Sequence, residues 1–354
     1  MKLEDLRKKI DKLDDQILDL LNERMEIVNS VGEIKRSSNS IIYRPEREKT
    51  IIDRLTKRSK GLLKQKAIEA IFLEIFAVSR NLELPERVAF LGPEGSFTHQ
   101  AAESRFGANS EYLSIKSISS VFETISAGRA RFGVVPVENN QEGIVQETID
   151  LIGRHDLHIV AEIPLPIHFS FATRQEKVSE IKKIYSKDIA FRQCRNFLED
   201  LFGDQVELIP VNSTSTAVKM SKEEPNSAAI CSHIAAKEYG LPILFENIED
   251  SDANHTRFWI LAKDMVNQPA QNNKTSLLAK LPDSPGSLAS FLEAFHTAGI
   301  NLSKVESRPA KEGKKFKYWF FVECDGHFQD AKIQEALAPF IKNVKWLGSY
   351  VKLC

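Results

Sequence analysis

Ser251-Asp252-Ala253-Asn254-His255-Thr256-Arg257-Phe258 is a polar stretch that leads without a break into the apolar run Trp259-Ile260-Leu261-Ala262. The apolar run has the length and composition of a buried strand. A hydroxyl beside a guanidinium at the mouth of a strand is where α/β folds often place their chemistry. A turn with one surface charge gives the same pattern, so the interpretation depends on the rest of the chain.

Upstream of this stretch, strand and helix patterns alternate from Val88 to Tyr239. The alternation predicts two small α/β lobes, the second inserted between Pro164 and the return strand at Phe258. Ligands of such folds bind in the cleft between the lobes, so we expect residues 92–98, 138–143 and 254–258 to face it. The glycine loop after the first strand is expected either to point backbone N–H groups at an anion or to be a structural turn.

Residues 87–265 resemble prephenate dehydratase, and four motifs carry the resemblance: Gly92-Pro93-x-Gly95-x-Phe97-x-His99-x-Ala101-Ala102, Val137-Glu138-Asn139-x-x-x-Gly143, Ser213-Thr214-x-Thr216-Ala217 and Thr256-Arg257-Phe258. The resemblance implies a two-lobed fold like that of periplasmic binding proteins. It also implies that Thr256 is essential, that Asn139 and Gln193 have catalytic roles, and that Arg257 contacts a substrate carboxylate or the scaffold. Because a threonine is a weak acid, we expect Thr256 to position the leaving hydroxyl of prephenate rather than to protonate it.

The chain departs from this family at three places. Asn140 stands where Ser or Thr is usual, and Lys187-Asp188-Ile189 replaces a frequent His-Pro-Gln run. His255 precedes the threonine, where we expect a role in the turn rather than acid catalysis.

The first part of the chain has apolar residues at alternating steps of three and four. This spacing predicts one long helix with a coiled-coil-like seam, which needs partner helices or a second subunit to cover it. The seam positions are Leu3, Leu6, Ile10, Leu13, Ile17, Leu20, Arg24, Ile27, Val31 and Ile34. Arg24 interrupts the seam, so it must meet an anion there, either a carboxylate of a neighbouring helix or a bound ligand.

Residues 1–85 resemble the all-helical chorismate mutase domain through Leu6-Arg7-x-x-Ile10-Asp11-x-x-Asp14, Glu23-Arg24, Gly32-x-x-Lys35 and Arg44-Pro45-x-Arg47-Glu48. A further helix from Lys66 to Leu84 would carry Ser79 and Glu83 on a common side. The resemblance implies an intertwined dimer in which Arg7 reaches the partner's site. The substrate-binding set that it implies is Arg7, Arg24, Lys35, Arg44, Arg47, Glu48, Ser79 and Glu83. Lys35 would donate to the ether oxygen of chorismate, and Glu83 would help only when protonated.

Residues 263–274 read as a polar linker, and beyond it the order strand, helix, strand, strand, helix, strand predicts a ferredoxin-like sandwich. Residues 275–354 resemble an ACT domain of the phenylalanine-sensing type. The resemblance implies that L-phenylalanine binds between two copies of the domain, at Gly286-Ser287-Leu288 and at Glu306-Ser307-Arg308 before Pro309. An inert dimerisation module is the alternative.

The composition is ordinary for a globular protein, with 42% hydrophobic and 27% charged residues and a formal net charge of -1. No global charge favours nucleic acid or membrane partners, and no apolar run approaches the roughly 20 residues that span a bilayer. The four cysteines form no CxxC pair, so we expect free thiols in the cytoplasm and no metal site.

As a whole, the chain resembles the bifunctional chorismate mutase–prephenate dehydratase family. This implies two consecutive steps from chorismate through prephenate to phenylpyruvate, on the route to phenylalanine, without metal or organic cofactor. It also implies feedback inhibition by L-phenylalanine and a homodimer or larger homo-oligomer. Two rivals remain: a dehydratase whose helical domain serves only for dimerisation, and a non-catalytic regulator that binds amino acids.

Overall fold

The computed structural model describes residues 3–37, 45–83, 87–108, 110–251, 253–309 and 318–352. The chain divides into two compact units, which are described separately. The first comprises Met1–Glu86 and Phe106–Glu111, and the second comprises Arg87–Arg105 and Tyr112–Cys354. No helix in the described ranges is long and apolar enough to cross a membrane.

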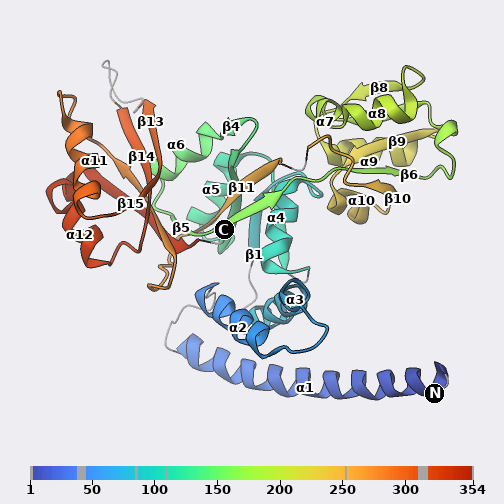
Figure 1. Ribbon diagram of the computed structural model, residues 1–354, viewed down its shortest axis with the longest axis horizontal. Coiled ribbons are helices and arrows are strands. Elements are labelled where there is room, and N and C mark those ends of the chain that lie inside the picture. The colour runs from blue at the N-terminus through green and yellow to red at the C-terminus, as the bar shows by residue number, and fades with distance from the viewer. Residues whose placement is uncertain are drawn as a thin grey trace. The chain divides into compact units, whose positions relative to one another are not determined.

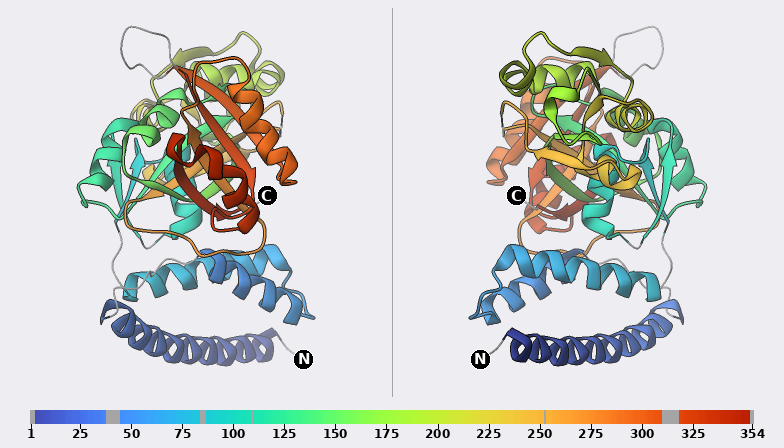
Figure 2. Two further views of the ribbon diagram at one scale, coloured as in Figure 1. Left: turned by 90° about the vertical axis from the view of Figure 1, so that its left-hand side faces the viewer. Right: turned by 90° about the vertical axis from the view of Figure 1, so that its right-hand side faces the viewer.

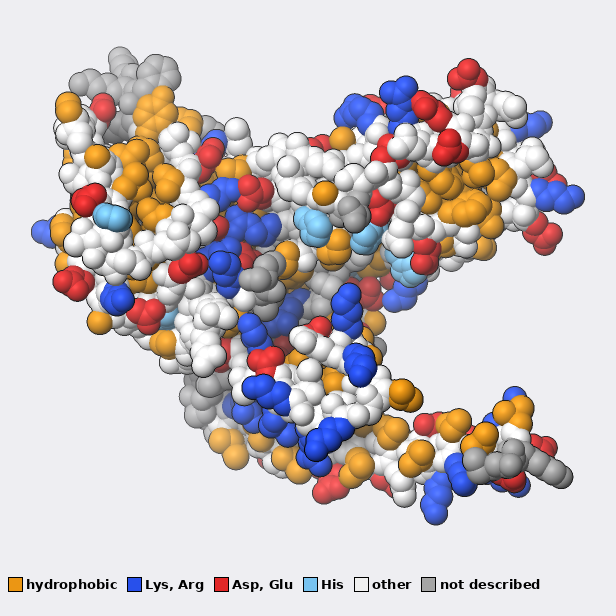
Figure 3. All heavy atoms as spheres, viewed as in Figure 1, with side chains coloured by type: hydrophobic (Ala, Val, Ile, Leu, Met, Phe, Trp, Pro, Cys, Tyr) orange, Lys and Arg blue, Asp and Glu red, His pale blue; other side chains and the backbone are white. Residues whose placement is uncertain are grey.

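The first unit is helical (Figures 1 and 2). Its helices are α1 (Leu3–Ser37), α2 (Pro45–Arg58) and α3 (Gln65–Glu83). The single long helix predicted from the seam is confirmed, and the later helix begins one residue before the predicted Lys66, while Leu84 lies outside the described residues. Within one chain the seam stays open to solvent, because its apolar side chains are between 39% and 68% exposed. Figure 3 shows these hydrophobic side chains along α1.

The second unit begins with lobe 1, a mixed sheet in the order β2-β1-β3-β11-β5, with β4 paired to β3. The strands are β1 (Arg87–Leu91), β2 (Glu111–Ile115), β3 (Phe132–Asn139), β4 (Gly143–Ile144), β5 (His158–Pro166) and β11 (His255–Ala262). Helices α4 (Phe97–Phe106), α5 (Ile118–Ser126) and α6 (Gln146–Arg154) belong to the same lobe. Strand β11 lies between β3 and β5 in this sheet and is antiparallel to both. The chain therefore leaves lobe 1 after Pro166 and returns to it at His255.

Lobe 2 lies between these two points, as predicted, and has its own sheet in the order β10-β6-β9-β7-β8. Its strands are β6 (Ser170–Thr173), β7 (Lys183–Ser186), β8 (Glu207–Pro210), β9 (Ser227–Cys231) and β10 (Ile243–Glu246), and its helices are α7 (Asp188–Gln193), α8 (Arg195–Phe202), α9 (Thr214–Glu223) and α10 (His233–Tyr239). Ser213 and Ser232 cap α9 and α10 through their hydroxyls. Helix α7 starts at Asp188, and Cys194 separates it from α8.

The C-terminal part has the predicted βαββαβ order and the sheet order β13-β14-β12-β15, which is ferredoxin-like. Its elements are β12 (Asn273–Ala279), α11 (Ser287–Thr297), β13 (Leu302–Pro309), β14 (Tyr318–Asp325), α12 (Ala331–Leu337), the 3₁₀ helix Ala338–Asn343 and β15 (Val344–Val351). Helices α11 and α12 cover one face of the sheet (Figure 1). The other face packs on lobe 1, where Leu278, Phe321 and Tyr350 share a core with Ile159 and Trp259.

Residues 263–274 are not the simple polar linker that was predicted. Asn267 is buried, and its Nδ2 donates to the carbonyl oxygens of Val160 at 2.6 Å and Ser349 at 3.0 Å. His327 Nε2 lies 3.1 Å from the Asn267 carbonyl oxygen. The segment therefore contacts both lobe 1 and the C-terminal sheet, because its amide groups satisfy backbone groups of both.

Candidate active sites

In the helical unit, α1 and α3 bring together four of the predicted residues. Arg24 Nη1 donates to Ser79 Oγ at 2.5 Å, and Lys35 Nζ lies 2.6 Å from Glu83 Oε2. Burial lowers the pKa of the Arg24 guanidinium, and the Glu83 carboxylate acts in the opposite direction. Among the described residues Arg24 forms no ion pair, so its direct partner is a neutral hydroxyl. A half-buried guanidinium placed in this way favours the ligand interpretation over the structural ion pair.

Glu48 reaches the same region from α2, where Arg80 is its ion-pair partner. Arg80 is buried, and the sequence analysis missed it. A lone arginine within an otherwise apolar helix face, next to Ser79, was the signal that could have found it.

Two of the remaining predicted mutase residues, Arg7 and Arg47, do not join this cluster. Arg7 lies on α1 seventeen residues before Arg24, which places it roughly 25 Å away along the helix. Arg47 is exposed on α2. Arg44 lies outside the described residues.

In the second unit, Thr256 and Asn139 are directly opposite each other on β11 and β3. Asn139 Oδ1 accepts hydrogen bonds from the backbone N–H groups of Gln141 and Glu142 at 2.9 and 3.0 Å. This fixes the orientation of the amide, so its Nδ2 is the donor to Thr256 Oγ1 at 2.8 Å. Within the described parts of the chain nothing accepts the Thr256 proton, and the hydroxyl retains its donor capacity.

The same amide starts a directed chain of hydrogen bonds between the lobes. Asn139 Nδ2 also donates to Asn254 Oδ1 at 2.9 Å, and Asn254 Nδ2 donates to Gln193 Oε1 at 3.2 Å. Gln193, at the end of α7 in lobe 2, donates in turn to Gln141 Oε1 of lobe 1 at 2.5 Å. The sequence analysis named neither Asn254 nor Gln141 as a site residue. Asn254 is only 3% exposed, and its place in the polar stretch before Thr256 was the available signal.

Asn140 and His255, two of the departures from the family, hold the turn before β11. Asn140 Nδ2 donates to the Ala253 carbonyl oxygen, and Asn140 Oδ1 accepts from the His255 N–H at 3.0 Å. The His255 ring is exposed and contacts the Ala253 carbonyl oxygen through Nδ1. These bonds favour the turn role for His255. Lys187, in the third departure, precedes the first residue of α7.

The glycine loop before α4 uses its N–H groups internally. Gly95 N–H donates to His99 Nδ1 at 3.1 Å, and Ser96 N–H donates to the Pro93 carbonyl oxygen. Burial lowers the pKa of His99, which suits a neutral imidazole that accepts at Nδ1. Gly95 has a φ of 77°, and a Cβ there would lie 2.8 Å from Ala235 Cα. These bonds favour the structural turn over the anion-binding alternative.

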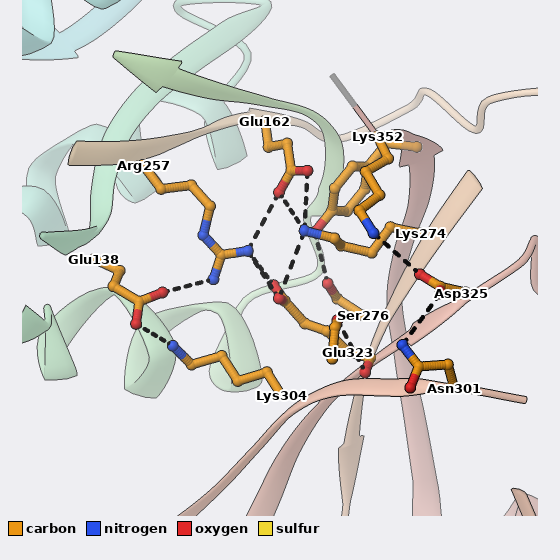
Figure 4. Close-up of polar contacts among 12 residues, drawn as sticks. Glu138, Glu162, Arg257, Lys274, Ser276, Asn301, Lys304, Glu323, Asp325 and Lys352 are labelled. Carbon is orange, nitrogen blue, oxygen red and sulfur yellow. Dashed lines mark hydrogen bonds and ion pairs between the residues drawn. The ribbon is translucent and has the colours of Figure 1, made fainter. Parts of the chain in front are cut away.

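Arg257 follows Thr256 but points away from it, because successive side chains of a strand lie on opposite faces. Its guanidinium donates to Glu323 at 2.7 and 2.8 Å, to Glu162 at 3.2 Å and to Glu138 at 3.0 Å (Figure 4). Burial acts to lower the pKa of Arg257, but Glu323 and Glu162 more than offset it and the pKa is raised. These ion pairs favour the scaffold role over the carboxylate-binding role for Arg257.

The C-terminal residues expected to bind phenylalanine separate into two groups. Ser287 and Leu288, at the start of α11, line a cavity of 430 Å³ together with Trp319. Gly286 precedes the helix with a φ of 85°. The second group, Glu306-Ser307-Arg308, lies on β13.

Arg308 does not face that cavity. Its Nε and Nη2 donate to Asp150 Oδ1 on α6 at 3.1 and 3.0 Å. The guanidinium is thus engaged by lobe 1.

Metal-binding groups and reactive thiols do not form a further site in the described ranges. No group of three or more His, Cys, Asp or Glu side chains there could hold a metal ion. Cys194, Cys231 and Cys324 are buried free thiols, and burial raises the pKa of each.

Three family models match successive parts of the chain. They are described as chorismate mutase type II, over residues 6–84, prephenate dehydratase, over residues 88–266, and ACT domain, over residues 275–340. These matches confirm the three resemblances seen in the sequence.

Individual relatives agree with this order. A bifunctional chorismate mutase/prephenate dehydratase from Aquifex aeolicus is 40% identical over 357 residues, which cover 99% of this chain and 98% of that protein. The prephenate dehydratase of Bacillus subtilis is 37% identical and covers 75% of this chain and 98% of its own length. The crystal structure of a prephenate dehydratase from Arthrobacter aurescens in complex with L-Phe is similar with a TM-score of 0.68 at 32% identity, covering 75% of this chain and 90% of that one. The chain therefore belongs to the family of bifunctional chorismate mutase/prephenate dehydratases and carries both activities.

Proposed function

We propose that residues 1–85 convert chorismate to prephenate, that residues 87–265 convert prephenate to phenylpyruvate, and that residues 275–354 sense L-phenylalanine and inhibit the second step. The observation that carries the dehydratase assignment is the Asn139–Thr256 pair, in which the threonine hydroxyl accepts from a fixed amide and keeps its own proton for a ligand. The mutase assignment rests on the cluster of Arg24, Lys35 and Glu48.

The mutase step is a [3,3] rearrangement without proton transfer, so the enzyme acts by positioning and electrostatics. Arg24 binds a carboxylate of chorismate in the compact conformer. Lys35 exchanges its ion pair with Glu83 for a hydrogen bond to the ether oxygen, where negative charge develops. A seam built only for dimerisation gains nothing from a half-buried Arg24, which speaks against the dehydratase-only rival.

The dehydratase step expels the ring hydroxyl together with CO2 and is driven by aromatisation. Thr256 donates a hydrogen bond to the leaving hydroxyl, and Asn139 holds Thr256 in the orientation that allows it. The Asn139–Asn254–Gln193–Gln141 chain joins the lobes around this point, so that closing of the cleft and orientation of Thr256 are linked. A regulator that only bound an amino acid has no need for a hydroxyl oriented in this way.

Purified protein incubated with chorismate tests both activities and their control. We expect chorismate loss and phenylpyruvate formation, followed separately, and we expect added L-phenylalanine to slow phenylpyruvate formation.

Glu306→Gln should raise the phenylalanine concentration that is needed for inhibition, because a carboxylate suited to the ligand's amino group is lost. Glu293→Gln, on the exposed part of α11, is the matched control. If phenylalanine does not slow phenylpyruvate formation by the unaltered protein, the ACT domain would be a dimerisation module instead.

The open seam of α1 and the distance between Arg7 and Arg24 support a homodimer. A second α1 lying on the seam would cover the exposed apolar side chains, and it would bring its Arg7 to the Arg24 end if the helices run antiparallel. Each mutase site would then contain Arg7 of the partner subunit and Arg24 of its own.

Mixing two inactive variants tests this arrangement. Arg7→Ala and Arg24→Ala should each have little mutase activity, because each removes a cation that binds a carboxylate. After unfolding and refolding together, a random mixture should recover roughly a quarter of the sites, since half the dimers are mixed and each has one intact site. The measurement is chorismate loss before and after mixing. No recovery, while dehydratase activity returns fully, would contradict shared sites.

A further inference from the structure

Strand β13, which carries Glu306-Ser307, is joined to lobe 1 on both sides of these two residues. Lys304 Nζ lies 2.5 Å from Glu138 Oε1, and Arg308 donates to Asp150 Oδ1 at 3.0 and 3.1 Å. Positions 304, 306 and 308 share one face of the strand because side chains alternate. Glu306 therefore lies between two ion pairs that both reach the dehydratase part.

The two carboxylates on lobe 1 bracket the segment that contains Asn139. Glu138 is the residue before Asn139 at the end of β3, and Asp150 lies on α6 at the other end of the segment. Helix α6 is tied back to β3, because Thr148 Oγ1 donates to the Pro136 carbonyl oxygen at 2.7 Å. Residues 138–150 are thus held at both ends by side chains of β13.

A third ion pair reaches Thr256 from the same domain. Arg257, the next residue on β11, is bonded to Glu323 of β14 and to Glu138 of β3 (Figure 4). The register places Arg257 opposite Glu138, and Thr256 opposite Asn139. Asn139 and Thr256 are therefore each next in sequence to a charged residue, Glu138 or Arg257, that forms an ion pair with the C-terminal domain.

Of the two ion pairs on β13, Arg308–Asp150 is the more buried, with side chains 8% and 14% exposed, while Lys304 is 15% and Glu138 is 32% exposed. In the adjoining network Glu162 and Glu323 are each 3% exposed, and Lys274 neutralises them together with Arg257. Separating one partner would leave an uncompensated charge away from water, which is strongly unfavourable. A displacement of β13 is therefore followed by Glu138 and Asp150 rather than absorbed at the interface.

We propose that β13 is the coupling element between the phenylalanine sensor and the dehydratase site: a ligand that shifts Glu306-Ser307 moves residues 138–150 through the Lys304–Glu138 and Arg308–Asp150 pairs, and so alters the Asn139–Thr256 geometry. This inference rests on the proposed control by phenylalanine and names the residues that transmit it. Lys304 and Asp150 are positioning residues that touch neither substrate nor phenylalanine. The effect requires only that phenylalanine bind the two positions of β13 with different affinity.

The test uses the full chain with Lys304→Met, Asp150→Asn and both together. Lys304→Met removes the first pair, and Asp150→Asn weakens the second from the dehydratase side without altering the ACT domain. Lys183→Met is the matched control, because it removes a lysine at 2.6 Å from Glu224 within lobe 2. For each protein, phenylalanine binding is measured by calorimetry, and the dehydratase rate with added prephenate is measured at increasing phenylalanine. The dehydratase rate without phenylalanine reports that the second unit is folded.

In the double variant we expect phenylalanine still to bind. The dehydratase rate at saturating phenylalanine should approach the uninhibited rate. The coupling between phenylalanine binding and the dehydratase site, typically roughly 5- to 150-fold, would then be largely lost. Each single variant should lose part of it, and Lys183→Met should lose none. Unchanged inhibition in both single variants, with phenylalanine bound as in the unaltered protein, would overturn the role of β13. Absence of inhibition in the unaltered protein would instead overturn the proposed phenylalanine control. If the double variant fails to fold, the two single variants decide the question.

Discussion

Thr256→Val is expected to lower the dehydratase rate by about 10²- to 10³-fold, the usual effect of removing one preorganised hydrogen-bond donor from an active site. Valine keeps the shape of the side chain but removes the hydroxyl that we propose as the donor to the leaving group. It also leaves Asn139 Nδ2 with Asn254 as its remaining side-chain partner. Because the mutase residues are untouched, the variant should convert chorismate to prephenate and accumulate it. The measurement follows chorismate, prephenate and phenylpyruvate in one incubation.

Thr297→Val is the control for this experiment, because Thr297 is exposed at the end of α11. It should form phenylpyruvate at the unaltered rate. Phenylpyruvate formation by Thr256→Val within a few-fold of the unaltered enzyme would show that the hydroxyl is not needed, and Asn139 would then have to act on the substrate directly.

The converse effect is expected from Lys35→Met in the helical unit. Lys35 is the cation that we propose to bind the ether oxygen of chorismate, so its loss should lower mutase kcat/KM by about 10²- to 10³-fold. Dehydratase activity measured with added prephenate should not change. The two variants together therefore separate the two activities on one chain.

Lys12→Met serves as the matched control, since Lys12 is exposed on the same helix. Circular dichroism checks that α1 remains helical in both variants. Chorismate consumption by Lys35→Met at the unaltered rate would refute the assignment of Lys35 and leave Arg24 and Arg80 as the candidate donors.

The fold was largely predictable from local pattern. The spacing of apolar residues by three and four positions predicted α1, and the apolar run after Thr256 predicted β11. The order of strands and helices predicted the C-terminal sandwich. Cys194 shows the limit, because one residue outside helical geometry divides a segment that the pattern presents as one helix.

The site was predictable only where a motif carried it. Asn254, Gln193 and Gln141 are distant in sequence, and only the pairing of β3 with β11 and the position of α7 bring their amides together. The contacts of Arg257 and Arg308 were not predictable for a related reason. Each belongs to a motif of functional residues, but its charge serves a contact between domains that no local pattern reveals.

The insertion of lobe 2 between β5 and β11 has a consequence for the order in which the chain folds. All strands of lobe 2 lie between Pro166 and His255, so its sheet needs no strand from outside this stretch. Lobe 1 cannot complete its sheet in this way, because its inner strand β11 arrives only after the whole of lobe 2. Contacts between distant segments form late, since closing long loops is entropically unfavourable. During synthesis β3 and β5 therefore remain without their common partner until β11 has been made.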